Sequence, residues 1–372
     1  MVHSLNITDK LGLEIIDLVV KLNAFLAPLR VQAQSQLRVL EAEIVKEVLS
    51  QDLESLSGYL TRVRKLERIL KQIGIVLDRR YGFLLNKVGQ ELRTIPKFTQ
   101  DGLLRKSMGI FKIGAIKRSL LAIQLRAVAD QDIVLGEPVA DWLMAQKEAL
   151  RRRIVQQLRM GVTGGETNSS LIQRLRGRPT GRTIEVQLPR GFPRRIKEYA
   201  GGVFDSSRTH ADVLIRTASM SLFNKTLLKV YQENTSTIIG FQSWSVWDRG
   251  STDVCKKRNG LAWFLDGQSM TKGSKESQFP GPPPWHFQCH TTLIPVMKSW
   301  KTLSMNRRLR KIPKAVRSIM DGQGDSGVIK TIKDWVRLYG ETEAIQQLGP
   351  RLYSSWKNGR ITTTQLIDAA GA

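Results

Sequence analysis

A run of aliphatic residues at helical spacing is the feature that most constrains the fold of this chain. Apolar side chains recur every three or four positions, at Leu49, Leu53, Leu56, Leu60, Val63, Leu66, Leu70, Ile73 and Leu77. This period places them on one face of a continuous helix, and such a face must be covered by another helix. Because Gly58 and Gly74 interrupt the run and no flanking charge pattern is sustained, we expect an antiparallel helical pair or bundle rather than a partner-binding coiled coil.

The pattern changes further along the chain. One helix is expected at 138–161. A second, short helix is expected to begin after a cap at Thr167 or Asn168, and a third is expected to run from a cap at Ser206 or Ser207 through Tyr231. Residues 177–193 are rich in glycine and proline and are expected to form a loop. Short strands are expected at 241–247, 261–265 and 291–296, where apolar and aromatic residues alternate with polar ones or gather in short β-rich runs.

These elements predict a mainly α protein with a small α+β domain. The chain has 372 residues, enough for two or three domains whose cores need no disulfides. We expect a helical N-terminal domain at 1–150, a basic helix and linker at 151–200, an α+β domain at 201–300 and a helical C-terminal segment at 301–372.

Charge is the strongest compositional signal. The formal net charge is +25, which predicts an acidic partner such as nucleic acid. Residues 151–200 alone hold 12 basic and 3 acidic side chains, and this segment could either follow a phosphate backbone or form a solvated surface loop. The candidate DNA-binding residues are Arg151, Arg152, Arg153, Arg174, Arg176, Arg178, Arg182, Arg194 and Arg195.

The composition also bears on location. The most apolar N-terminal stretch, 11–29, carries charged residues and a proline, so we expect neither an export signal nor a membrane span. Two cysteines cannot build a secreted-type disulfide framework and fit a protein made in a reducing cytoplasm.

Both cysteines and two of the four histidines lie in one short window. His286 and Cys289 form an H-x-x-C pattern that supplies two zinc-type ligands on one turn, and Cys255 could supply a third from a preceding hairpin. Asp253, His290 or water would be the fourth ligand, although Cys289 and His290 can both bind only at an irregular turn, because neighbours in a strand point to opposite faces. Two alternatives stay open, namely thiols packed as small apolar groups and a disulfide between the two cysteines.

The same window resembles a known family. An aromatic strand with an acidic turn ("WSVWDRGSTDVCKKRNGLAWF") is followed by a proline-rich loop that ends in His-x-x-Cys before a strand closing with Pro-Val ("FPGPPPWHFQCHTTLIPV"). A helix with an Arg-Thr pair, Arg216 and Thr217, precedes them. This arrangement is similar to the C-terminal core of the phage Mu gpF-like head morphogenesis proteins. The segment "IKDWVRLYGETEAIQQLGPRLYSSWKNGRITTTQLID" also resembles a segment often found in phage head proteins.

The resemblance implies a structural minor head protein of a tailed phage, not an enzyme. It implies incorporation during capsid assembly at or near the portal vertex, on the inner side of the virion, after synthesis in the host cytoplasm. The implied partners are the portal protein, capsid or scaffolding proteins, and double-stranded DNA bound without sequence preference. No nucleotide-binding, hydrolase-elbow or metalloprotease motif is present, so no catalytic residue is assigned.

Two other functions remain as alternatives at this stage. One is a metal-dependent nucleic-acid enzyme, and the other is a membrane-active ejection protein delivered with the genome. The candidate metal ligands are Cys255, His286 and Cys289, and zinc is the candidate cofactor.

Overall fold

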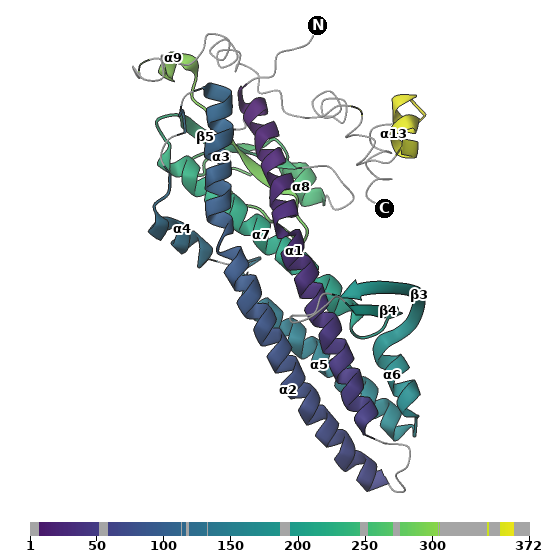
Figure 1. Ribbon diagram of the computed structural model, residues 1–372. Helices are drawn as coiled ribbons and strands as arrows, with labels where there is room; N and C mark the ends of the chain where they lie inside the picture. The colour runs from purple at the N-terminus through teal and green to yellow at the C-terminus, as the bar shows by residue number, and fades with distance from the viewer. Residues whose placement is uncertain are drawn as a thin grey trace. The chain divides into compact units, whose positions relative to one another are not determined.

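The computed structural model describes residues 7–51, 59–112, 114–116, 119–131, 133–186, 194–245, 252–270, 276–303, Met305, Glu341 and 350–360. Helices dominate this part of the chain, and its strands form two two-stranded sheets and one three-stranded sheet (Figure 1). The expected fold class, mainly α with a small α+β part, is confirmed. The chain divides into two compact units: unit 1 combines Met1–Leu22, Thr94–Gln131 and Ser219–Ala372, and unit 2 combines Asn23–Arg93 and Asp132–Ala218.

Long helices build unit 2. They include the C-terminal part of α1 (Ile7–Ser50), α2 (Tyr59–Leu92) and α5 (Val139–Thr163). Along α2, buried side chains recur at helical spacing at Leu66, Ile69, Ile73, Leu77, Tyr81 and Leu84. This face packs against α5, whose own buried stripe contains Leu143, Leu150, Ile154 and Leu158. The helical packing expected from the spacing is confirmed.

The continuous helix expected across positions 49–77 is wrong. α1 ends at Ser50, α2 begins at Tyr59, and the two helices run antiparallel in unit 2 (Figure 1). Leu49 is 56% exposed, so the first member of the stripe is not part of the core. Two successive helices that bury aliphatic side chains have the same period, and the period alone does not reveal a chain reversal between them.

The loop expected at 177–193 is wrong for the part that the structure describes, 177–186. The short helix is confirmed as α6 (Asn168–Arg176), and the Thr167 hydroxyl accepts a hydrogen bond from the Ser170 N–H at 3.2 Å. α6 leads directly into β3 (Gly177–Val186), which pairs antiparallel with β4 (Arg194–Gly201), where a loop was expected. Cross-strand pairing outweighs the low strand propensity of the glycines here. We call the β3–β4 pair the basic ribbon.

Glycine is required where the basic ribbon begins. Gly177 and Gly201 face each other across the two strands, with φ values of 82° and 79° that other residues rarely adopt. A Cβ on Gly177 would collide with the Ala200 carbonyl oxygen.

The other two-stranded sheet of unit 2 is very short. It consists of β1 (Ile133–Val134) paired with β2 (Glu137–Pro138) and precedes α5.

Unit 1 is built on the three-stranded antiparallel sheet. β5 (Ile238–Ser245) is central, with β6 (Ala262–Phe264) on one side and β7 (Thr291–Met297) on the other. These strands confirm the three that were expected, within the residues described. Seven of the eight residues of β5 are buried. A strand buried on both faces needs cover on both sides, which accounts for its run of apolar and small polar residues.

The long helix α7 (Asp205–Glu233) covers the free edge of β7 with its C-terminal part. The Tyr231 hydroxyl donates to the Leu293 carbonyl at 2.9 Å, and the Asn224 side-chain oxygen accepts from the Leu293 N–H at 3.0 Å. An uncovered edge strand leaves such backbone groups unpaired and invites association with other strands. Pro295 lies two residues further along the same edge, where a missing N–H costs no ladder bond.

Unit 1 also contains the N-terminal part of α1 and α3 (Ile95–Phe111). α1 approaches β5 closely, because a Cβ on Gly12 would collide with the Trp244 ring. Trp263 is fully buried and contacts Phe241 and Phe279, with ring centroids 6.1 and 5.2 Å away. Trp244 and Trp263 are therefore core residues of unit 1. The remaining helices are α4 (Ala122–Ala129), α8 (Asp253–Arg258), α9 (Trp300–Leu303) and α13 (Pro350–Lys357).

The expected domain boundaries do not coincide with the two compact units. α5 continues through position 150, β4 spans position 200, and α1 and α7 each contribute to both units. Long helices shared between units leave no composition change for a sequence pattern to mark. Most of the helical C-terminal segment expected at 301–372 lies outside the described residues. No helix in the described ranges has the length and apolar character needed to cross a bilayer.

Candidate metal centre and basic surface

Cys255 is held at the edge of the unit 1 sheet by α8, a short helix rather than the hairpin that was expected. The helix follows β5 along the chain and is tied back to it through Ser245 and Asn259. The Ser245 N–H donates to the Asn259 side-chain oxygen at 2.9 Å, and the Ser245 hydroxyl donates to the Cys255 carbonyl at 3.2 Å. These bonds place the Cys255 thiol, which is 2% exposed, beside the start of β7.

His286 and Cys289 come from the loop that leads into β7. They are the ends of one tight turn, in which the Cys289 N–H donates to the His286 carbonyl at 3.3 Å. Gln288, the third residue of the turn, has a φ of 59°, a left-handed value that few non-glycine residues adopt. The turn brings both side chains to the side of Cys255, and Cys289 is 1% exposed.

Three ligand atoms therefore meet. The Cys255 sulfur lies 2.9 Å from His286 Nε2 and 3.5 Å from the Cys289 sulfur, and all three atoms lie within 4.8 Å of one another. Two sulfur ligands of one tetrahedral zinc would be about 3.8 Å apart, given zinc–sulfur bonds of about 2.3 Å. This group, which we call the Cys–His cluster, could hold a metal ion.

The histidine is oriented for binding through Nε2. His286 Nδ1 lies 2.7 Å from the Phe287 carbonyl, so Nδ1 carries the proton and donates it. The lone pair of Nε2 is then directed at the cluster. Metal-binding histidines usually donate their second ring N–H to a carbonyl or carboxylate in this way, which fixes both the tautomer and the ring orientation.

A hydrogen bond joins the two thiols. The hydrogen bond from Cys255 lowers the pKa of Cys289 to about 5, and the same bond together with burial raises the pKa of Cys255. Cys289 is the group held as a thiolate, the form of cysteine that binds metals. Both cysteines are free, and their 3.5 Å separation is well beyond the about 2.05 Å of a disulfide bond, so the disulfide alternative is not the state seen here.

The two side chains considered as a fourth ligand, Asp253 and His290, lie outside the cluster. Among the described residues, neither Asp253 nor His290 brings a ligand atom into this group. The Asp253 side chain is 85% exposed and lies 4.0 Å from the Lys256 ammonium. His290 follows Cys289 directly and precedes β7, and it is not a member of the group.

Arg258 and Trp285 hold the loop against α8, and the sequence did not reveal this pairing. The Arg258 guanidinium lies over the Trp285 ring, 4.6 Å from its centroid, and Arg258 Nε donates to Glu276 at 2.8 Å. The Trp285 indole N–H donates to the Gly281 carbonyl at 3.0 Å. A cation over an aromatic face is a favourable contact, and this one fixes the residue next to His286.

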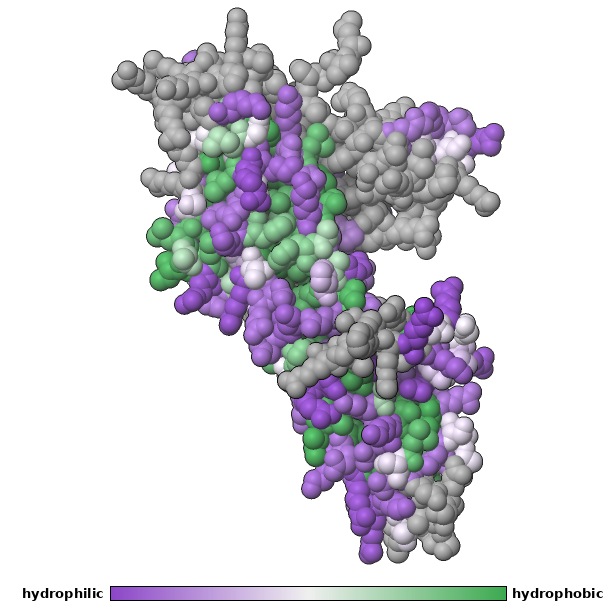
Figure 2. Space-filling model, in the orientation of Figure 1, coloured by the Kyte–Doolittle hydropathy of each residue, from purple (hydrophilic) through white to green (hydrophobic). Residues whose placement is uncertain are grey.

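The predicted DNA-binding residues fall into two groups in unit 2. Exposed cations lie on α5 and on the basic ribbon, at Arg151, Arg152, Arg178, Arg182 and Arg195. Hydrophilic side chains dominate the visible surface of the ribbon (Figure 2). Arg194 is the first residue of β4. Arg178 and Arg182 are exposed and form no ion pair with the acidic side chains that the structure describes, and Arg195 is exposed at the position opposite Glu185.

The other predicted residues have partners within the unit. Arg176 donates to the buried Glu41 at 3.1 Å and lies over the Tyr199 ring, 4.9 Å from its centroid. Arg153 is half-buried and donates to the Ser206 hydroxyl and to the Ala149 carbonyl. The contacts of both residues hold elements of unit 2 together. Arg208, which pairs with Glu41 at 2.8 Å, does the same.

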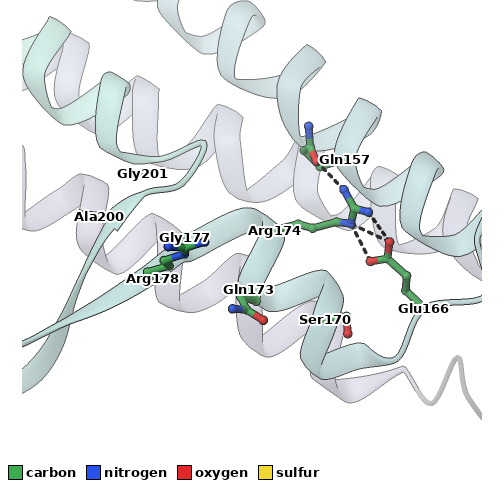
Figure 3. Close-up of a pocket in the computed structure, with 9 residues that line it drawn as sticks. All are labelled: Gln157, Glu166, Ser170, Gln173, Arg174, Gly177, Arg178, Ala200 and Gly201. Atoms are coloured by element: carbon green, nitrogen blue, oxygen red, sulfur yellow. Dashed lines mark hydrogen bonds and ion pairs between the residues drawn. The ribbon is translucent and has the colours of Figure 1, made fainter.

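Arg174 lies in an open pocket where the ribbon begins. The pocket has a volume of about 770 Å³ and is lined by Gln157, Glu166, Ser170, Gln173, Arg174, Gly177, Arg178, Ala200 and Gly201. Figure 3 shows the Arg174 guanidinium directed at the Glu166 carboxylate and the Gln157 amide. Sequence reasoning identified the arginine but not the pocket, because Glu166 and Gln157 carry no recognisable motif.

Comparisons with known proteins found no relative. A scan against protein-family models, a search of curated proteins and a search of solved structures each returned no match to this chain.

Proposed function

We propose that this chain is a structural minor head protein of a tailed phage. It would join the capsid during assembly, at or near the portal vertex and on the inner side, with the portal protein and capsid or scaffolding proteins as its protein partners. There it would contact packaged double-stranded DNA without reading sequence. The resemblance to the Mu gpF-like proteins supports the class, since the described parts of its strand, cysteine, proline-loop and closing-strand elements all belong to unit 1.

The basic ribbon is the feature that supports the proposed contact with DNA. It presents Arg178, Arg182 and Arg195 to solvent, in a chain with a net charge of +25. Each cation that neutralises a phosphate releases a counterion, which is the main source of sequence-independent affinity for DNA. A two-stranded ribbon is also narrow enough to enter the major groove of B-form DNA.

We further propose that the Cys–His cluster binds zinc in a structural role. Sulfur and imidazole ligands suit zinc and do not suit magnesium or calcium, which prefer oxygen. Bound there, the ion would cross-link α8 to the loop before β7. Cys255, His286 and Cys289 would supply its protein ligands, and the chemistry of the ion would be limited to that cross-link.

The presence of the protein in phage particles tests whether it is a minor head protein. Intact particles and capsid precursors are purified from cells that produce the phage, and the polypeptide is measured in each by mass spectrometry. We expect it in both, at a constant ratio to the portal protein. Its absence from particles and precursors would contradict the proposal.

A second measurement separates this function from a nuclease. The purified full-length chain is incubated with duplex DNA and a series of divalent metals. We expect intact DNA throughout. Cleavage that depends on metal and disappears in His286→Ala would show that the cluster is catalytic and would overturn the structural role.

A further inference from the structure

The pocket where the basic ribbon begins has the features of an anion site. Arg174 on α6 and Arg178 on β3 both line it, and Glu166 is the one acidic side chain among its lining residues. Two guanidinium groups and one carboxylate therefore line an open, polar space, in which Arg174 is directed at Glu166 and Arg178 lies beside Gly177 (Figure 3). Such a space retains positive charge and can accept a further anion.

Glu166 engages Arg174 in the way that a phosphate would. Arg174 Nε lies 2.8 Å from one carboxylate oxygen and 2.6 Å from the other, and Nη2 also donates to the carboxylate. The planar fork of arginine matches carboxylate and phosphate oxygens alike. The Arg174 hydrogen bond also lowers the pKa of Glu166, so Glu166 is charged at neutral pH.

The side of the pocket formed by the ribbon is open to a close approach. Gly177 and Gly201 pair at this point and have no side chains, and a Cβ built on Gly201 would meet nothing within 4 Å. Backbone without side chains lets a bulky tetrahedral anion come near the guanidinium groups. The exposed cations of the ribbon continue from this point, at Arg178 and Arg182.

We propose that this pocket binds one backbone phosphate of duplex DNA through Arg174, and that the Glu166 carboxylate occupies the place of the phosphate when DNA is absent. DNA then binds by displacing Glu166 from Arg174. The inference rests on the proposed DNA contact of the basic ribbon, and it adds a defined phosphate position and an internal competitor.

Substitutions of the pair test the displacement. The dissociation constant of the full-length chain for duplex DNA is measured over a series of salt concentrations. Glu166→Gln removes the competing charge, so we expect affinity to rise by about two- to five-fold, the range that an exposed ion pair supports. Arg174→Gln removes the phosphate ligand, so we expect weaker binding and a salt slope shallower by about 0.9. Arg174→Lys keeps the charge but lacks the planar fork, so its affinity for DNA should lie between those of the wild type and Arg174→Gln.

The double variant separates displacement from a general charge effect. If Glu166 acts only through Arg174, Glu166→Gln gives no gain in the Arg174→Gln background. Glu67→Gln on α2 is the matched control, because Glu67 is exposed and lies outside both the pocket and the basic ribbon, so the variant removes an equal charge elsewhere in unit 2. An equal gain from Glu67→Gln, or a gain that persists in the double variant, would overturn the inference while leaving DNA binding by the ribbon intact.

Wild-type protein with no affinity for duplex DNA would instead overturn the proposed function itself. Inorganic phosphate provides the last comparison, at an ionic strength matched with chloride. We expect it to displace DNA no better than chloride does. Displacement by inorganic phosphate that disappears in Arg174→Gln would show a site for free phosphate and would contradict the assignment to the DNA backbone.

Discussion

The three-stranded sheet of unit 1 and the basic ribbon of unit 2 are both small antiparallel structures, yet they are stabilised in opposite ways. In the sheet, most of β5 is buried, and α7 side chains satisfy the free edge of β7. In the ribbon, the side chains of β3 from Arg178 to Thr183 are exposed. The sheet is therefore suited to hold a fixed cross-link, whereas the ribbon keeps its side chains available for a partner.

The arginines of unit 2 likewise include both buried, paired residues and exposed ones. The Arg208 side chain is 9% exposed and pairs with Glu41, which also accepts from Arg176. Arg178 and Arg182, only a few residues beyond Arg176, face solvent. A cation that is held by a buried carboxylate contributes to the fold, and removing its partner leaves an unpaired charge. The count of basic residues in 151–200 therefore overstates the surface available to DNA.

A substitution in the unit 1 core should reduce stability much more than a substitution on the ribbon. Trp263→Ala removes a fully buried ring from the unit 1 core, so we expect the free energy of unfolding to fall by about 3–5 kcal/mol. Thr183→Ala in the exposed part of the ribbon should change it by less than about 0.5 kcal/mol. Chemical denaturation of both variants measures this, and equal losses would contradict the contrast.

Zinc should stabilise unit 1 through the Cys–His cluster. At a free zinc concentration of about 100 times the dissociation constant, binding to the folded state alone raises the free energy of unfolding by about 2.7 kcal/mol. We expect Cys289→Ser and His286→Ala to abolish this rise. His290→Ala is the matched control, because His290 lies outside the cluster, and it should keep the rise. A zinc-dependent rise that survives in Cys289→Ser would place the metal elsewhere.

A smaller effect concerns acid stability in unit 2. The hydrogen bond from Arg80 lowers the pKa of Glu43, and the Arg80 Nε lies 2.9 Å from the carboxylate. Because the folded pKa lies below the unfolded one, the pair stabilises the fold above the unfolded pKa, and this contribution is lost as pH falls through the folded pKa. We expect Arg80→Gln to reduce the loss of stability on acidification by about 1 kcal/mol or less. Unfolding measured from neutral to acid pH tests this, and an unchanged profile would contradict it.

Sequence patterns predicted the elements better than their boundaries. The three strands of unit 1 and the Thr167 cap of α6 were predictable, because alternation and capping are local signals. The ribbon was missed, because pairing across the described strands outweighs the local turn preference of glycine and proline at Gly177, Pro179 and Gly181. The break between α1 and α2 was missed, because both helices continue the same period.

The candidate site was predictable in part. The Cys–His cluster was found from residue type and spacing, which metal ligands require. Its surroundings were not, because the contact of Arg258 with Trp285 and the donation from His286 Nδ1 depend on a loop conformation that no spacing encodes. Likewise, composition could locate the arginines of 151–200 but could not distinguish those that pair with Glu41 from those that face solvent.

The salt dependence of DNA binding tests whether the ribbon is the DNA-binding surface. The full-length chain and a variant with Arg178, Arg182 and Arg195 changed to Gln are titrated with duplex DNA at several salt concentrations. Three lost phosphate contacts should make the slope of log affinity against log salt shallower by about 2.7. Arg64, Arg68 and Lys71, exposed cations on α2, are changed to Gln in the control, which should keep the wild-type slope. A ribbon variant with an unchanged slope, or a control that loses as much, would contradict the claim that the ribbon is the DNA-binding surface.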